Sequence, residues 1–279
     1  MAILVTTPTS KIGSALVALL SEQGCAVRVG AHTVEKAQNL FPTSNLVPLN
    51  FSDAASVEAA LHGIGALYLA PPRENFPVDP LLHTVVLAKA AGVKRSVFLS
   101  AMGVEDVETN ISQIERGVEA SGIDFTHLRI NVLLQNYSTM SAQAIRQQGV
   151  FAEPVGDERT SFVDARDVAA VAAAALTETG HAGHAYTLTG GVAHTRTEVA
   201  AAIAETISKP VRYQSLTEAE FRALANSLGW AEDFVSMILG FYEAHIRSGR
   251  STVVTDTVAR VLRRPPTALA QFVQDYRNV

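Results

Sequence analysis

The sequence predicts an α/β fold, a doubly wound parallel sheet with a small C-terminal α/β lid. Short apolar runs alternate with segments of helical spacing through residue 130. Glycines follow several of the helical segments, where helices commonly end. The 279 residues are 48% hydrophobic and 18% charged, a balance typical of a globular chain that buries a core.

The first half of the chain predicts strands and helices in regular alternation. The apolar runs expected as strands are residues 3–5, 26–29, 46–49, 66–69, 96–99 and 125–130. The segments expected as helices are residues 12–20, 34–40, 54–61, 80–91 and 111–120, and Gly24, Gly92 and Gly122 follow three of them. Such alternation indicates βαβ units with right-handed crossovers, so we expect parallel strands with helices on both faces.

In the second half the alternation is less regular, so the expected helices are placed mainly from helix-capping patterns. An alanine-rich helix is expected to begin at Asp164, with Asp167 three residues on. The other expected elements are a strand at residues 186–188, a helix after the box of Thr195 and Glu198, a strand at residues 211–213, and a helix at residues 221–228 after a box of Ser215 and Glu218.

The turn between the first expected strand and helix is where we expect a ligand. Doubly wound sheets bind ligands beyond the carboxyl ends of their strands, and dinucleotide-binding folds place three spaced glycines in this turn. Here only Gly13 is glycine, whereas Thr7 and Ser10 occupy the other two positions. Two interpretations stay open. The side chains of Thr7 and Ser10 crowd out a pyrophosphate, or the Thr9 and Ser10 hydroxyls and Lys11 bind it in place of the contacts that the missing glycines would allow.

Composition argues against several classes of function. A net charge of −5 and a pI of about 5.9 argue against nucleic acid as a partner. Cys25 is the single cysteine, which fits a reducing compartment, and no apolar stretch approaches the roughly 18 residues of a membrane helix. We therefore expect a cytoplasmic protein with no membrane partner. His181 and His184 lie in a glycine-flanked loop, so no metal is expected.

Several stretches resemble the NmrA-like family of atypical short-chain dehydrogenases/reductases, which mixes enzymes with redox-sensing regulators. The resembling stretches are residues 11–16, 35–37, 90–95, 119–129, 162–169 and 255–272. The resemblance covers nearly the whole chain and implies a Rossmann-like fold. It implies one NmrA-like domain over residues 1–279, with a dinucleotide-binding core at 1–135 and a mixed substrate lid plus closing elements at 136–279.

The resemblance also implies NADPH or NADH as cofactor, unless the altered turn has lost it. The implied cofactor contacts are Thr7, Pro8, Thr9, Ser10, Lys11, Ile12, His32, Lys36, Asn50, Phe51, Ala70, Pro71, Ser100, Ala101 and Met102. Two positions depart from the family. His32 stands where members that prefer NADPH often have arginine, a permanent phosphate partner, and Asn131 lies where proline is common.

Candidates for catalysis are sparse. None of the six tyrosines has a lysine four residues on, which argues against the usual Tyr-x-x-x-Lys mechanism of short-chain reductases. Tyr242 and His245, at i and i+3 of an expected helix, are the acid/base candidates, and Ser100 is a candidate hydrogen-bond donor to a substrate oxygen. The candidate substrate contacts are Met102, Asn131, Asn136, Tyr137, Phe162 and Trp230.

These observations predict an NAD(P)H-dependent reductase of a small conjugated or aromatic substrate, such as a quinone or an imine. Hydride transfer needs a well-placed nicotinamide and a dry pocket, so few catalytic side chains are required. Two alternatives stay open: a cofactor-independent enzyme that cyclises, isomerises or eliminates a natural-product intermediate, and a non-catalytic dinucleotide-binding sensor. A homodimer is also left open.

Overall fold

The computed structural model describes residues 1–72 and 77–278, which form two compact units. The first unit comprises Met1–Ile130, Ala165–Leu188 and Thr257–Arg264. The second comprises Asn131–Asp164, Thr189–Asp256 and Pro265–Val279. Each unit is therefore assembled from segments that are far apart in the sequence.

The first unit is built on a seven-stranded parallel sheet, as the sequence predicts. Its strands are β1 (Ala2–Thr6), β2 (Val27–Ala31), β3 (Asn45–Pro48), β4 (Ile64–Leu69), β5 (Arg95–Ala101), β6 (Asp124–Ile130) and β8 (His184–Leu188). Their spatial order is β3-β2-β1-β4-β5-β6-β8, and every neighbouring pair is parallel. The order reverses between β1 and β4, the place where doubly wound sheets bind ligands.

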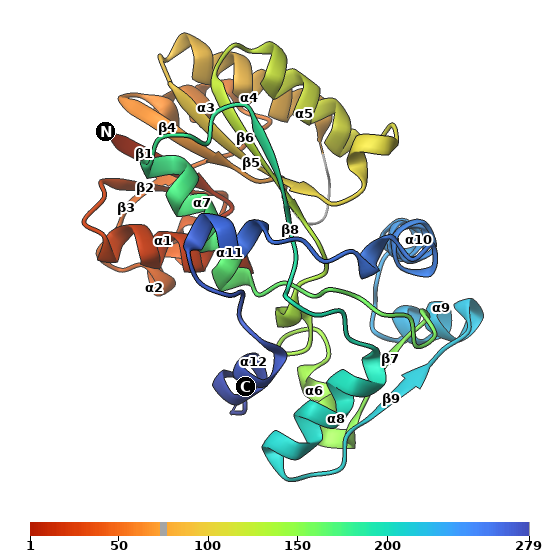
Figure 1. The fold of residues 1–279 in the computed structure, drawn as a ribbon. Helices are drawn as coiled ribbons and strands as arrows, with labels where there is room; N and C mark the ends of the chain where they lie inside the picture. The colour runs from red at the N-terminus through yellow and green to blue at the C-terminus, as the bar shows by residue number, and fades with distance from the viewer. Residues whose placement is uncertain (73–76, 279) are drawn as a thin grey trace. The chain divides into compact units, whose positions relative to one another are not determined.

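Helices cover both faces of this sheet (Figure 1). They are α1 (Lys11–Glu22), α2 (Val34–Leu40), α3 (Ala54–Leu61), α4 (Val78–Ala90), α5 (Asn110–Ala120), α7 (Ala165–Thr177) and α11 (Thr257–Leu262), with a short 3₁₀ turn at Val104–Asp106. Helices α3, α4 and α5 lie on one face, whereas α1, α7 and α11 lie on the other. The predicted bounds of α2 and α3 are confirmed.

The seventh strand extends the sheet beyond the six that were expected from the first half. The predicted strand at residues 186–188 lies within β8, which pairs with β6. It is reached through α7, in which ten of thirteen residues are buried, most of them alanines. Small side chains let a helix approach its neighbours closely, which explains how α7 packs against both α1 and the sheet.

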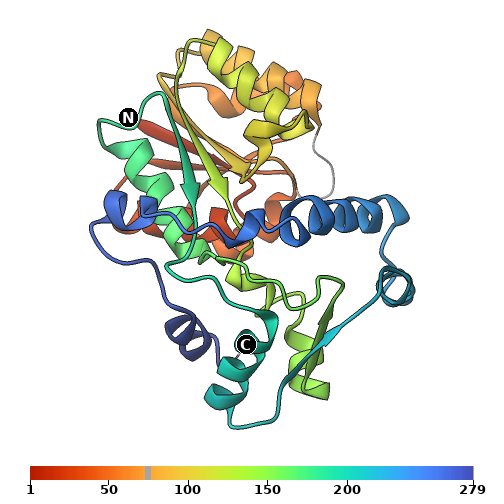
Figure 2. The same ribbon diagram turned by 45° about the vertical axis from the view of Figure 1, so that its right-hand side comes forward.

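The second unit is smaller and mixed. A parallel pair of strands, β7 (Val150–Glu153) and β9 (Arg212–Ser215), is accompanied by α6 (Ala142–Gln148), α8 (Arg196–Ile207), α9 (Glu218–Ser227), α10 (Glu232–Phe241) and α12 (Leu269–Asp275). Short 3₁₀ turns span Leu134–Asn136 and Arg250–Thr252, and a π-helical segment spans Tyr242–Arg247. The dark-blue α12 and the teal α8 lie side by side (Figure 2).

Capping boxes set the starts of two helices in this unit, α8 and α9. The predicted box of Thr195 and Glu198 at α8 is confirmed. The box predicted at Ser215 and Glu218 is wrong by two residues, because α9 is capped by Thr217 with Glu220. Ser215 is instead the last residue of β9, where it is paired with β7. Among residues 1–72 and 77–278, no helix has the length and apolar character needed to cross a membrane.

Candidate functional site

The turn between β1 and α1 keeps a tight, ordered shape without two of its glycines. Thr7 has φ of 48°, the left-handed region that glycine adopts readily. The backbone N–H of Ser10 donates to the Thr7 carbonyl (3.1 Å), and the Ser10 hydroxyl accepts from the Gly13 N–H (3.0 Å), which caps α1. A Cβ on Gly13 would lie 2.3 Å from the Thr7 oxygen. Glycine is therefore required at 13, while Thr7 tolerates a conformation that costs about 1–2 kcal/mol.

The Thr7 side chain leaves one polar atom without a partner. Its hydroxyl is buried and makes no hydrogen bond to any described residue. A buried, unpaired hydroxyl is costly unless a ligand or water completes it. It lies in the turn that opens a helix N-terminus, where backbone N–H groups and the helix dipole favour an anion. These residues therefore fit a dinucleotide pyrophosphate, although the Ser10 cap already uses one of the first N–H groups of α1.

A buried threonine joins the two strands at the reversal point of the sheet. The Thr6 hydroxyl donates to the Tyr68 carbonyl at 3.0 Å and accepts from the Ala70 N–H at 2.9 Å. This clamp holds the carboxyl ends of β1 and β4 together, directly beside Thr7. Sequence reasoning missed Thr6, and its only signal was a polar residue at the end of an apolar strand.

The remaining predicted cofactor residues of the first unit lie at the same edge of the sheet. His32 follows β2, Asn50 and Phe51 follow β3, Ala70 and Pro71 follow β4, and Ser100 to Met102 end β5 or follow it. Because all these strands are parallel, their carboxyl ends share one edge. His32 and Lys36 are exposed, so their side chains are accessible to a ligand.

Ser100 is bound to a buried carboxylate that sequence reasoning missed. Its hydroxyl donates to Glu115 Oε1 at 2.5 Å, and Arg129 donates to both oxygens of Glu115, at 3.0 and 2.7 Å. Burial opposes ionisation of Glu115, but the hydrogen bonds from Arg129 and Ser100 outweigh it and hold its pKa below the usual range. The one hydroxyl proton of Ser100 is thus committed, and donation to a substrate oxygen would require it to leave Glu115.

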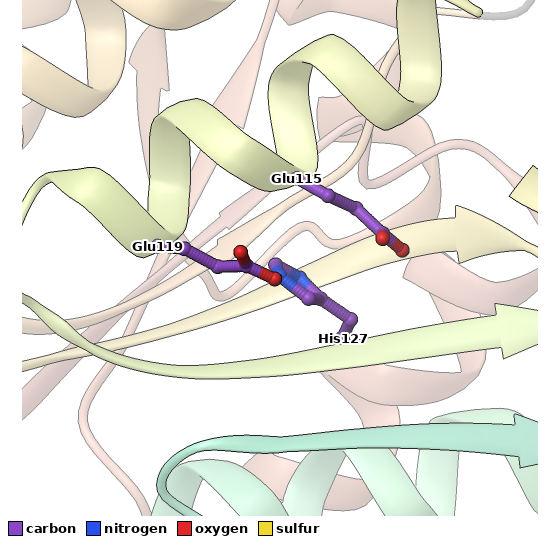
Figure 3. Close-up of side chains that lie close together, drawn as sticks. All are labelled: Glu115, Glu119 and His127. Carbon is purple, nitrogen blue, oxygen red and sulfur yellow. The ribbon is translucent and has the colours of Figure 1, made fainter. Parts of the chain in front are cut away.

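Glu115 also belongs to a cluster with Glu119 and His127 (Figure 3). Their nearest polar atoms lie within 4.8 Å of one another, and His127 Nε2 lies 3.2 Å from Glu119 Oε1. Burial lowers the pKa of His127, so its ring stays neutral near pH 7. Because a guanidinium already occupies both Glu115 oxygens, we assign the cluster to packing and charge pairing and not to a metal.

In the second unit, a buried histidine is held in one orientation. His245 Nε2 lies 2.9 Å from the Asn131 carbonyl oxygen, while the Asn131 amide donates to the Ser161 hydroxyl (2.8 Å) and the Ser251 carbonyl (2.9 Å). This network makes Nε2–H the donor. Burial, assisted by Arg250, lowers the pKa of His245 to about 4. The structure therefore brings together one predicted catalytic residue and one predicted substrate contact.

Tyr242 and His245 both contact Phe241 but otherwise have different surroundings. Both belong to the π-helical segment Tyr242–Arg247, in which the wider turn removes the i, i+3 alignment expected of an α-helix. Tyr242 packs edge-on against Phe221, whereas His245 stacks on Phe241. Burial and Glu153 raise the pKa of Tyr242 well above its usual value, so the hydroxyl stays protonated.

The predicted aromatic substrate contacts fall into two packed clusters. Tyr137 and Phe162 belong to one, with ring centroids 5.6 Å apart. Trp230 belongs to the other and packs edge-on against Phe221. Asn136 lies in the short turn Leu134–Asn136. These side chains build the interior of the second unit, a role that large aromatic residues commonly have.

Comparison with known proteins gives one consistent family. The sequence model described as "NmrA-like family" matches residues 1–272. The NAD(P)H azoreductase of Xenophilus azovorans is 31% identical over 98% of this chain and 96% of its own. Quinone oxidoreductase 2 of Escherichia coli is 30% identical over 94% of this chain and 99% of its own. The crystal structure of the E. coli NADPH-dependent quinone oxidoreductase with NADPH has a TM-score of 0.87 and 28% identity, and covers both chains fully.

Proposed function

Because the chain belongs to the NmrA-like family, we propose that it is an NAD(P)H-dependent reductase of a small conjugated or aromatic substrate, such as a quinone or an imine. Two full-length relatives at 30–31% identity are named an azoreductase and a quinone oxidoreductase. The first name gives NAD(P)H as the donor, and the second gives a quinone as the substrate. The chain spans nearly the whole length of each.

The observation that carries the proposal is the conformation of Thr7. Its left-handed backbone keeps the turn in the shape that glycine would otherwise supply, and its buried hydroxyl lacks a partner within the described residues. A strained residue with an unsatisfied polar atom, at a helix N-terminus beside the reversal of a parallel sheet, is typical of a ligand site. This supports the interpretation that the turn still holds a pyrophosphate over the interpretation that its side chains exclude one.

In this proposal the chain's own residues bind and orient. A bound nicotinamide cofactor would supply the hydride. Thr7 to Ile12 would hold the pyrophosphate, His32 and Lys36 the adenosine end, and Ser100 to Met102 the end that reacts. Lys36 is exposed and could contact a 2′-phosphate, whereas His32 could donate one hydrogen bond.

Tyr242, His245 and Ser100 are not equally suited to the proposed acid/base roles. Ser100 is committed to Glu115, and Tyr242 is packed among aromatic rings. His245 donates its Nε2–H to Asn131, so in this tautomer its Nδ1 would act as an acceptor toward a substrate hydroxyl. We further propose a small-molecule substrate and a cytoplasmic location, since a single cysteine suits a reducing compartment.

Calorimetric titration of the purified chain with NADPH and with NADH tests the proposal. We expect micromolar binding of at least one, followed by substrate-dependent oxidation of the bound cofactor with menadione or an azo dye. Binding without turnover of any quinone, imine or azo compound would favour the sensor. Absence of binding up to millimolar cofactor would overturn the reductase and favour a cofactor-independent enzyme on the same fold.

A further inference from the structure

The second unit contains a cavity that the proposed reductase chemistry does not use. It has a volume of about 420 Å³ and is lined by residues of α6, α8, α12 and the segments beside them. Every lining residue belongs to the second unit, whereas the proposed cofactor contacts belong to the first. The volume lies within the range of small-molecule pockets, roughly 300–1,000 Å³.

Part of the wall of this cavity is apolar. Ile145, Ile203 and Phe272, from α6, α8 and α12, are each less than a tenth exposed and belong to one hydrophobic cluster. An apolar wall of this kind favours an alkyl or aromatic body over a sugar or a nucleotide, because burial of apolar surface stabilises the complex.

The rim carries positive charge, and the described lining residues include no acidic side chain to balance it. Arg146, Lys209 and Arg277 line the cavity, and none of the described lining residues is acidic. These three side chains are exposed and form no ion pair with the described part of the chain. The whole chain has a net charge of −5, so the positive charge around this cavity is opposite in sign to that of the chain as a whole.

Four other arginines of the same unit differ from these three side chains. Arg159, Arg196, Arg222 and Arg247 each pair with a glutamate.

We propose that this cavity binds a small amphipathic anion, a molecule with an apolar body and one carboxylate head. The isoleucines and Phe272 would contact the body, and Lys209 and Arg277 would face the head in partly hydrated ion pairs. The site is independent of the cofactor, so the ligand should bind with or without NADPH.

Calorimetric titration of the full chain with decanoate tests the proposal, with decanol as the uncharged analogue of equal length. We expect saturable one-to-one binding of decanoate and much weaker binding of decanol. The double variant Lys209→Glu/Arg277→Glu should weaken decanoate binding about tenfold or more, since each exposed ion pair contributes modestly and the contributions combine. The double variant Lys94→Glu/Arg212→Glu is the matched control, because it reverses two exposed charges away from the cavity.

Thermal unfolding of both double variants must match the parent before affinities are compared. Equal decanoate affinity in the cavity variant and the control variant would overturn the proposal, as would equal binding of decanoate and decanol. Displacement of decanoate by NADPH would place the anion at the cofactor edge and would also overturn it. If NADPH fails to bind while decanoate binds as expected, the reductase proposal fails and this one stands.

Discussion

Replacing Gly13 by alanine is the sharpest perturbation of the proposed phosphate turn. The added Cβ would lie 2.3 Å from the Thr7 carbonyl oxygen and 3.0 Å from the Pro8 Cα, both backbone atoms. Backbone atoms cannot rotate away as a flexible side chain would, so the turn itself must open. Opening it would also disturb the bond between the Ser10 N–H and the Thr7 carbonyl.

The expected magnitude follows from two opposing effects. Alanine in place of glycine stabilises a helix by about 1 kcal/mol, whereas overpacking costs about 1–3 kcal/mol. Together these effects predict that Gly13→Ala lowers the free energy of unfolding by up to about 2 kcal/mol, a fall in Tm of up to a few degrees. Gly240, in α10, has no atom within 4 Å of an added Cβ. The matched variant Gly240→Ala should therefore leave stability unchanged or raise it.

Denaturant unfolding and NADPH titration of both variants are the assays. Gly13→Ala should lose cofactor affinity beyond its loss of stability, because the displaced Thr7 carbonyl and hydroxyl no longer shape the turn. Gly240→Ala should bind as the parent does. If Gly13→Ala is as stable as Gly240→Ala and binds cofactor equally well, the reasoning about the turn is refuted.

The remaining predictions concern buried charges and hydrogen bonds. Glu153→Gln should cost about 3 kcal/mol in denaturant unfolding, because it leaves the fully buried Arg196 without its counter-ion, and a loss below 1 kcal/mol would contradict this. Because the pKa of His245 is lowered to about 4 in the folded state, its neutral form stabilises the fold above pH 6.5, and this stability is lost as the pH falls toward 4. His245→Gln should flatten the stability profile in that window by up to about 1.4 kcal/mol per pH unit, and an unchanged slope would refute the assignment. Ser100→Ala should lower stability by about 1.5–3 kcal/mol through loss of the bond to Glu115, and an unchanged midpoint of unfolding would contradict that role.

Local signals in the sequence were sufficient for much of the fold. Periodicity predicted α2 and α3 with their observed bounds, and the Thr-x-x-Glu pattern predicted the start of α8. The same kind of signal failed at α9, because two overlapping candidate boxes are separated by two residues. Only the pairing of β9 with β7 shows that Ser215 belongs to a strand.

The candidate site was predictable to a smaller extent. The sequence indicated the sheet edge and the altered turn, because a few consecutive residues are enough to recognise a strand end or a turn. The Thr6 clamp and the Glu115 carboxylate were missed, because their partners lie 62 and 15 residues away. The spacing of Tyr242 and His245 suggested a shared face, yet the backbone between them is π-helical.

The sequence by itself determined the alternation of strands and helices through residue 130, the parallel sheet and the edge at which the strand ends meet. Those properties depend on local periodicity and on handedness, which neighbouring residues encode. Only the tertiary structure decided that Thr7 takes a left-handed conformation, that Ser100 serves Glu115, and that His245 meets Asn131 across 114 residues. Such pairings depend on the path of the whole chain and on which buried polar groups must find partners, and no local pattern records either.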